Sequence, residues 1–250
     1  MKSKTPRRRK PSAAARVRRF WVLALLLALG VASAAVAIML WPGFYPRNLV
    51  VSGNLHVSRG EILARAGIAP DVNMWLQDPH AMAERIESIP YVELAAIHRI
   101  PPSTVTITIT ERVPVAVVRS GALFALVDGE LHVIRSVVGP QPELPVLIAG
   151  PNVALLPGSV LGDPDTVALR DAQKALDGAH VAIAALALDR FGEIVATLPG
   201  GIVLELGDEE SMDRKLALVK PILAQAARSS RPVAAIDLRA PSTPVLVYKK

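Results

Sequence analysis

The sequence has 250 residues, 51% of them hydrophobic, which is enough for a packed core and for one or two folded domains. Nine of its 28 Lys and Arg residues lie in residues 1–19, which contain no acidic residue, and the rest has 19 basic against 22 acidic residues. This distribution argues against a nucleic-acid-binding surface on the folded part. The absence of cysteine excludes disulfides, thiolate nucleophiles and cysteine-based metal sites.

An uncharged run of 22 residues, from Phe20 to Trp41, follows the basic tail. Its length matches the roughly 20 residues that a helix needs to cross the hydrocarbon core of a bilayer. Aromatic residues stand at both ends, where they favour the membrane interface. The positive charge before the run places residues 1–19 in the cytoplasm and residues 43–250 on the other side. We therefore predict a cytoplasmic tail over 1–19 and a transmembrane helix over 20–41.

Two features of this segment leave alternatives open. The triplet Ala32-Ser33-Ala34 resembles a signal-peptidase site, although signal peptides usually have a shorter apolar region of about 7–15 residues. We predict an uncleaved anchor, which a mature protein beginning near Ala35 would contradict. We predict that the basic tail sets the topology and weakly attracts anionic lipid, with a cytoplasmic docking role as the alternative.

The first exported unit is predicted to contain two helices and three strands. Ser58 stands three residues before Glu61, which predicts a capping box, and Gly67 is predicted to close that helix. Asp78-Pro79 predicts the start of the second helix. Apolar residues then alternate with threonines in the last segment, as expected for a strand with one buried face. The predicted order is strand 47–54, helix 61–67, helix 79–89, strand 91–99 and strand 104–112, a small sheet with two helices on one face.

The second exported unit is predicted to be a mostly antiparallel sheet with flanking helices, so the fold class is α+β. Asp128-Gly129 predicts a tight hairpin, Gly178 is predicted to follow the end of a helix, and Pro221 is predicted to kink another. The predicted strands are 115–119, 123–127, 130–134, 146–148, 182–188, 194–198, 201–206, 233–238 and 245–248, and the predicted helices are 164–176 and 208–227.

No group of residues in the sequence predicts catalysis. The five histidines have no metal-ligand spacing: His56, His80, His98, His132 and His180. The acids Asp208-Glu209-Glu210 and Asp213 are interpreted as residues that favour a helix N-terminus. We therefore predict no enzyme activity, no catalytic residue, no cofactor, no metal and no small-molecule substrate.

Binding by strand addition is the alternative that a domain with exposed sheet edges offers. The short apolar strand Val245–Tyr248 is the last predicted element. It could lie at a sheet edge and accept a strand from a partner, or it could be paired on both sides and only close the core. The sequence favours neither interpretation.

The exported part resembles the FtsQ/DivIB family of bacterial division proteins. The resemblance in the first unit covers Val50-Val51-Ser52-Gly53-Asn54, Val57-Ser58, Glu61-Ile62, Ile89-Pro90-Tyr91-Val92, Ala95, Ile97, Arg99 to Val105 and Glu111 to Ala116. In the second unit it covers Gly201 to Gly207, Lys215-Leu216 and Ile236-Asp237-Leu238-Arg239. It implies a POTRA domain (β-α-α-β-β) over 45–114 and a C-terminal β domain over 115–250.

The resemblance also implies a function. Family members are non-enzymatic divisome assembly factors of the bacterial inner membrane that bind FtsB and FtsL in the periplasm and help control septal peptidoglycan synthesis. Their last strand binds the partner, which assigns Val245, Val247 and Tyr248 here, and a basic residue on a nearby strand matches Arg190. This chain has Ala240-Pro241 where an aromatic residue is expected after the D-L-R motif, so either partner binding is weaker here or Tyr248, Val245 and Val247 carry more of the contact.

Two other functions compete with this one. In proteins of outer-membrane assembly or secretion, POTRA domains precede a long β-barrel. This sequence does not show the many alternating strands that such a barrel needs. A periplasmic cell-wall hydrolase would need a nucleophile or a metal motif.

Overall fold

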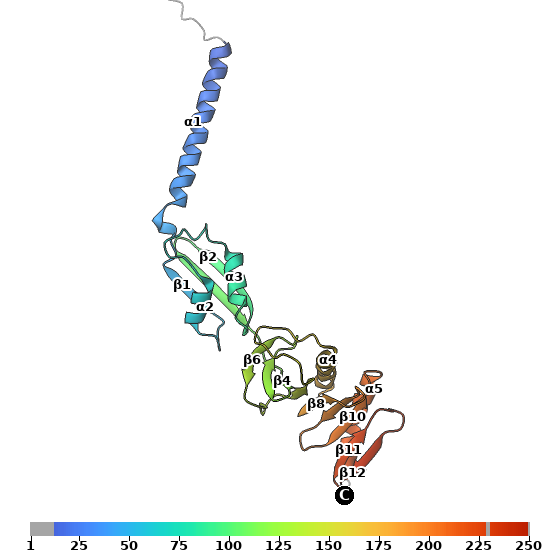
Figure 1. Ribbon diagram of the computed structural model, residues 1–250. Helices are drawn as coiled ribbons and strands as arrows, with labels where there is room; N and C mark the ends of the chain where they lie inside the picture. The colour runs from blue at the N-terminus through green and yellow to red at the C-terminus, as the bar shows by residue number, and fades with distance from the viewer. Residues whose placement is uncertain (1–12, 229–230, 250) are drawn as a thin grey trace, which may run out of the picture.

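The computed structural model describes residues 13–228 and 231–249, and it comprises one long helix followed by two domains (Figure 1). The helix α1 spans Ala13–Met39. Its segment Val17–Met39 has 23 residues, and the most apolar stretch of 18 residues in it has a mean hydropathy of 2.6 and no residue buried against the rest of the protein. At helical rise this segment is about 35 Å long, which is enough to cross a bilayer. The helix begins before the predicted Phe20, while residues 1–12 of the predicted tail lie outside the described residues.

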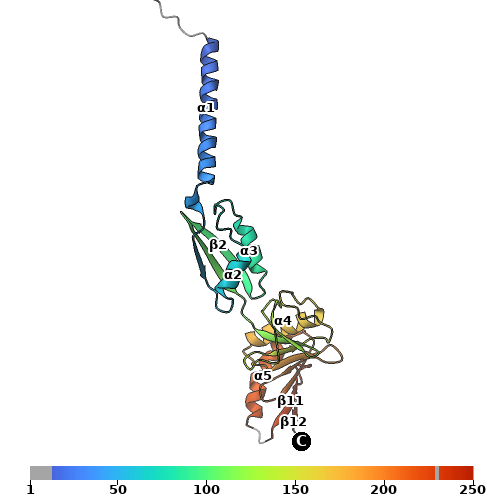
Figure 2. The same ribbon diagram turned by 60° about the vertical axis from the view of Figure 1, so that its left-hand side comes forward.

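The first domain contains the predicted β-α-α-β-β order. Its elements are β1 Asn48–Ser52, α2 Arg59–Ala66, α3 Pro79–Glu87, β2 Val92–Ile100 and β3 Thr104–Glu111. The sheet order is β1-β3-β2, with β1 parallel and β2 antiparallel to β3. Figure 2 shows α2 and α3 on the same face of this sheet.

Local signals decide where the two short helices begin. The Ser58 hydroxyl accepts a hydrogen bond from the N–H of Glu61, and the Asp78 carboxylate accepts one from the N–H of His80. Gly67 ends α2 in the left-handed conformation, with φ of 62°. The apolar residues of β3 face these helices, since Val105, Ile107 and Ile109 are all buried. The predictions for this domain are thereby confirmed at the level of its elements.

The loop after β1 is organised by a carboxylate from the end of β3. Glu111 accepts hydrogen bonds of 2.8–2.9 Å from the consecutive N–H groups of Leu55, His56 and Val57, and its side chain is only 6% exposed. Burial opposes the ionisation of Glu111. The hydrogen bonds from Val57 and His56 outweigh it and hold the pKa of Glu111 below its ordinary value of 4.5. The ionised carboxylate therefore stabilises this loop.

The Glu111→Gln substitution is expected to lower the free energy of unfolding of the first domain by about 2 kcal/mol near neutral pH, because charged hydrogen bonds are lost. Since the folded-state pKa of Glu111 is lowered, its stabilisation is present above the ordinary value of 4.5 and is lost as the pH falls through the folded-state value. Urea unfolding of both proteins at neutral and acid pH should show the difference shrinking in acid. The exposed Glu93→Gln substitution is the control, and a difference that does not change with pH would contradict this role.

The second domain contains one sheet of nine strands and two helices. The elements are β4 Ala116–Ser120, β5 Leu123–Val127, β6 Val133–Val137, β7 Val146–Ile148, α4 Pro164–Gly178, β8 Ala185–Leu188, β9 Ile194–Thr197, β10 Val203–Gly207, α5 Met212–Ala226, β11 Val233–Asp237 and β12 Val245–Tyr248. The strand order is β12-β11-β10-β9-β8-β7-β4-β5-β6. Most neighbours are antiparallel, and β4–β7, β7–β8 and β10–β11 are parallel.

The main core lies between this sheet and its helices. One row of buried side chains runs across paired strands, including Leu147, Leu186, Ala196, Leu204 and Ile236. They share one cluster with the apolar residues of α4 and α5. On the other face, a small cluster of Val117, Leu126 and Ile134 packs with Tyr91 of the first domain. The two domains therefore meet at the β4–β6 end of the sheet.

Besides the starts of β8 and β10, which lie at Ala185 and Val203 and not at the predicted 182 and 201, three predicted boundaries in this domain are wrong. The hairpin after Asp128-Gly129 is wider than predicted, because the Asp128 carboxylate accepts hydrogen bonds from the N–H groups of Glu130 and His132, and β6 begins only at Val133. Gly178 is the last residue of α4 and not its terminator. The left-handed residue after this helix is His180.

The third correction concerns α5, which begins at Met212 and not at Asp208. Only Asp213 lies in its first turn. Asp208 instead forms a salt bridge of 2.8 Å with Lys215, whose side chain is buried. The helix continues past Pro221 to Ala226.

A candidate partner-binding edge

β12 is an edge strand of the nine-stranded sheet. It pairs antiparallel with β11, from Val245 opposite Asp237 to Tyr248 opposite Val233, and no other described strand pairs with it. Figure 1 shows it at the end of the molecule farthest from α1. Of the two interpretations that the sequence left open, the structure therefore favours a strand with one free side.

The two faces of β12 have different surroundings. Val245 and Val247 are 54% and 48% exposed and point away from the helices. Leu246 and Tyr248 point to the other face, where they pack against the main core. The predicted anchor Tyr248 is therefore partly buried, and the guanidinium of Arg231 lies 5.0 Å from the centre of its ring.

The backbone of β12 can accept another strand along its free side. The N–H of Lys249 donates to the carbonyl of Pro232, so it points toward β11. Backbone direction alternates along a strand, and the N–H and C=O groups of Leu246 and Tyr248 are then directed to the free side. A partner strand could pair with both residues.

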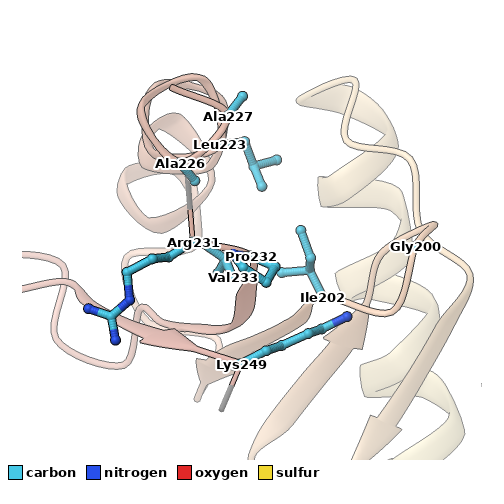
Figure 3. A pocket seen from close by; sticks show the side chains of 9 residues that line it. All are labelled: Gly200, Ile202, Leu223, Ala226, Ala227, Arg231, Pro232, Val233 and Lys249. Carbon is cyan, nitrogen blue, oxygen red and sulfur yellow. The ribbon is translucent and has the colours of Figure 1, made fainter. Parts of the chain in front are cut away.

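A hollow of about 380 Å³ lies beside the end of β12 (Figure 3). Apolar side chains form much of its lining: Ile202, Leu223, Ala226, Pro232 and Val233. Arg231 and Lys249 line it as well, and Figure 3 shows the Lys249 side chain extending toward the turn at Gly200. The hollow therefore offers apolar contact next to two basic groups.

The opposite end of β12 lies near a compact ionic cluster. Arg239 forms salt bridges with Asp237 at 2.7 Å, Glu205 at 3.3 Å and Glu193 at 3.5 Å. Hydrogen bonds from the Arg239 guanidinium lower the pKa of Asp237. The two ions of the D-L-R motif therefore hold each other in place beside the start of β12.

Arg190 lies away from the other three predicted residues. It belongs to the turn between β8 and β9, where its guanidinium lies 4.6 Å from the ring centre of the exposed Phe191. Hydrogen bonds from the N–H groups of Glu193 and Phe191 lower the pKa of Asp189 and fix this turn. The strand directions place Arg190 at the end of the sheet opposite Tyr248. The structure brings together Val245, Val247 and Tyr248 but not Arg190, whose role stays a prediction.

Within the described residues, no group of three or more His, Asp or Glu side chains could hold a metal ion. The chemistry that the edge of β12 offers is that of binding, through backbone pairing, apolar contact and basic groups.

Comparison with known proteins extends over most of the chain. Residues 44–112 match the model of the POTRA domain, FtsQ-type, and residues 116–239 match that of the cell division protein FtsQ/DivIB C-terminal domain. The chain belongs to the FtsQ/DivIB family. It therefore has the two domains of this family of cell division proteins, an FtsQ-type POTRA domain and an FtsQ/DivIB C-terminal domain, after a helix long and apolar enough to cross a membrane.

Several cell division proteins named FtsQ are similar to this chain over most of its length. The cell division protein FtsQ of Mycolicibacterium smegmatis is 30% identical over 239 residues, which is 92% of this chain and 66% of that protein. FtsQ of Syntrophotalea carbinolica is 30% identical over 190 residues, or 73% of this chain and 66% of that protein. FtsQ of Mycobacterium tuberculosis is 28% identical over 244 residues, or 95% of this chain. The chain thus spans just under two thirds of the length of the first two relatives.

The basic residues beside the candidate edge, Arg231 and Lys249, were not predicted from the sequence. Arg231 contacts the ring of Tyr248, and Lys249 lines the neighbouring hollow. The available signal was that Arg231 precedes the predicted strand 233–238 and Lys249 follows the predicted strand 245–248. It was not specific, because the pairing of β11 with β12 could not be deduced from the sequence.

Proposed function

We propose that this chain is a non-enzymatic divisome assembly protein that binds the FtsB–FtsL-type pair by adding a partner strand to β12. In this way it links early and late division proteins and helps control septal peptidoglycan synthesis. The observation that carries the proposal is the free side of β12. An added strand would satisfy backbone groups that otherwise bind only water.

The side chains around this edge support a partner of particular chemistry. Val245 and Val247 would pack against apolar residues of the added strand on the face without helices. The hollow beside Tyr248 would receive another apolar side chain, and Arg231 and Lys249 would attract an acidic residue next to it. A partner segment with alternating apolar residues and an acidic flank fits these features.

The topology in this proposal has a cytoplasmic N-terminus and periplasmic domains. The concentration of basic residues before the transmembrane helix supports it. Partner binding would then take place in the periplasm of dividing cells, and the protein would gather at the division septum. Arg190 and Phe191 would form a second, separate contact if the partner extends along the end of the sheet.

Val247→Lys is expected to weaken partner binding at least about tenfold, because a charge replaces an exposed apolar contact of the added strand. Tyr248→Ala is expected to cost about 2 kcal/mol, or roughly 30-fold, as for an aromatic anchor. Binding is measured between the full-length protein in nanodiscs and the FtsB–FtsL-type pair of the same bacterium.

Val138→Lys is the matched control, since Val138 is a fully exposed valine beyond β6, at the other end of the sheet. It should bind like the unmodified protein. Circular dichroism of each variant separates lost binding from lost folding, because Tyr248 also packs against the core. Unchanged affinity for both β12 variants, with the fold intact, would reject β12 as the binding edge.

A further inference from the structure

The loop between α2 and α3, residues 68–77, is attached to the end of the transmembrane helix. The side-chain amide of Asn73 donates to the carbonyl oxygens of Met39, at 3.0 Å, and Ile38, at 3.3 Å. Asn73 is only 3% exposed, and the N–H of the next residue, Met74, donates to the carbonyl of Phe44. The loop therefore lies at the level of the last turn of α1.

Several other hydrogen bonds hold this loop in one conformation. The amide of Gln77 pairs with both backbone groups of Ala69 at 2.8 and 2.9 Å. Arg99, from β2, donates to the carbonyl oxygens of Met74 and Gln77. The side-chain oxygen of Asn73 accepts from the N–H of Trp75. A loop with so many internal bonds presents a fixed surface.

The surface that this loop presents is apolar. Val72, Trp75 and Leu76 are large apolar side chains on this loop, and they are 37%, 48% and 51% exposed. Asp71 is the only charged residue between positions 68 and 77. The guanidinium of Arg99 lies 5.0 Å from the ring centre of Trp75. This combination of a tryptophan, aliphatic side chains and a nearby arginine is typical of the boundary between lipid and water.

The distance from α1 places this surface in the boundary region. Trp75 is two residues from Asn73, so their Cα atoms are at most about 7 Å apart. The polar boundary of a bilayer extends about 5–7 Å beyond the hydrocarbon on each side. Trp41, at the end of the membrane-spanning segment, is 58% exposed at the same level. The third tryptophan of the chain, Trp21, lies near the other end of α1.

We propose that the loop 68–77 binds the surface of the bilayer that α1 spans, with Trp75, Leu76 and Val72 inserted among the lipid headgroups. The POTRA domain would then be held against the membrane at two points, the end of α1 and this loop. Its tilt would be fixed by the second contact, and with it the direction in which the C-terminal domain extends from the membrane. This contact is separate from partner binding at β12.

Quenching of tryptophan fluorescence by lipids brominated near the headgroup tests this contact. Trp75 is kept as the only tryptophan by Trp21→Phe and Trp41→Phe, and the full-length protein is reconstituted into phosphatidylcholine vesicles with and without the brominated lipid. Brominated vesicles are expected to quench Trp75 nearly as strongly as Trp41 in a matched protein that carries Trp21→Phe and Trp75→Phe. A protein without the three native tryptophans but with Phe191→Trp should not be quenched, because Phe191 lies in the turn after β8, a strand that Figure 1 shows far from α1.

Asn73→Ala, introduced into the protein that retains only Trp75, tests the attachment of the loop. Loss of the bonds to Ile38 and Met39 should reduce the quenching of Trp75 toward that of the Phe191→Trp protein. Quenching of Trp41 but not of Trp75 would overturn the proposal, because it would place the loop in water or against another protein. Quenching of Trp75 that Asn73→Ala leaves unchanged would overturn the role assigned to Asn73.

Discussion

Gly53→Ala is expected to lower the free energy of unfolding of the POTRA domain by at least about 3 kcal/mol. Gly53 follows β1 with φ of +83°, a backbone conformation that disfavours any residue with a Cβ. That Cβ would also overlap the carbonyl oxygen of Ile109. The oxygen belongs to the backbone of β3, the central strand, and cannot move aside as the end of a side chain could.

The measurement is urea unfolding of the full-length protein in detergent, with Trp21→Phe and Trp41→Phe so that the fluorescence comes from Trp75, which lies in the POTRA domain. Gly60→Ala is the matched control, since Gly60 lies in α2 and nothing lies within 4 Å of a Cβ added there. This control should be neutral or slightly stabilising, because alanine favours a helix. Equal stability of Gly53→Ala and the unmodified protein would show that β1 and β3 can separate without loss of the fold.

Most of the POTRA domain could be predicted because its signals are local. Ser58 and Asp78 form the caps that the sequence indicated, and the alternation in β3 buries its apolar residues as expected. The sequence could not show why glutamate and arginine stand together at the end of β3. Glu111 binds the loop after β1, while Arg112 forms a 2.7 Å salt bridge with Asp128 of the second domain.

The C-terminal domain was harder to predict because its sheet is assembled from segments far apart in sequence. β4 pairs with β7 across an intervening hairpin, and β10 pairs with β11 across α5. Periodicity indicates that a segment is a strand but gives no information on its neighbours. The wide turn after Asp128 and the late start of α5 likewise depend on side-chain hydrogen bonds that the turn and helix signals do not contain.

Only part of the candidate site could be predicted, because the sequence does not show which strands are neighbours. Val245, Val247 and Tyr248 were also assigned through the family resemblance, but they lie on one short strand that the sequence itself indicated, and its alternation places the two valines on the open face. Arg190 was assigned through the family resemblance, and the strand order separates it from Tyr248. Arg231 was missed, since its contact with Tyr248 exists only once β11 and β12 are paired.

Lys215→Ala is the second large effect, with an expected loss of about 3 kcal/mol from the stability of the C-terminal domain. Lys215 lies in α5 and is 1% exposed, and its ammonium group donates to the carbonyl and carboxylate oxygens of Asp208 at 2.9 and 2.8 Å. The side chain of Asp208 is 68% exposed, so water can replace the lost partner. Most of the loss should therefore come from the cavity that the aliphatic part of Lys215 leaves.

A second substitution of Lys215 distinguishes the loss of packing from the loss of charge. Lys215→Met keeps the volume and removes the charge, so it should cost only about 1 kcal/mol if packing dominates. Lys220→Ala, at an exposed position of the same helix, should change stability by less than about 0.5 kcal/mol. Urea unfolding of the C-terminal domain, followed by circular dichroism, compares the three variants. Equal losses for Lys215→Ala and Lys215→Met would show that the ionic contact with Asp208, and not the packing of the aliphatic part of Lys215, stabilises α5.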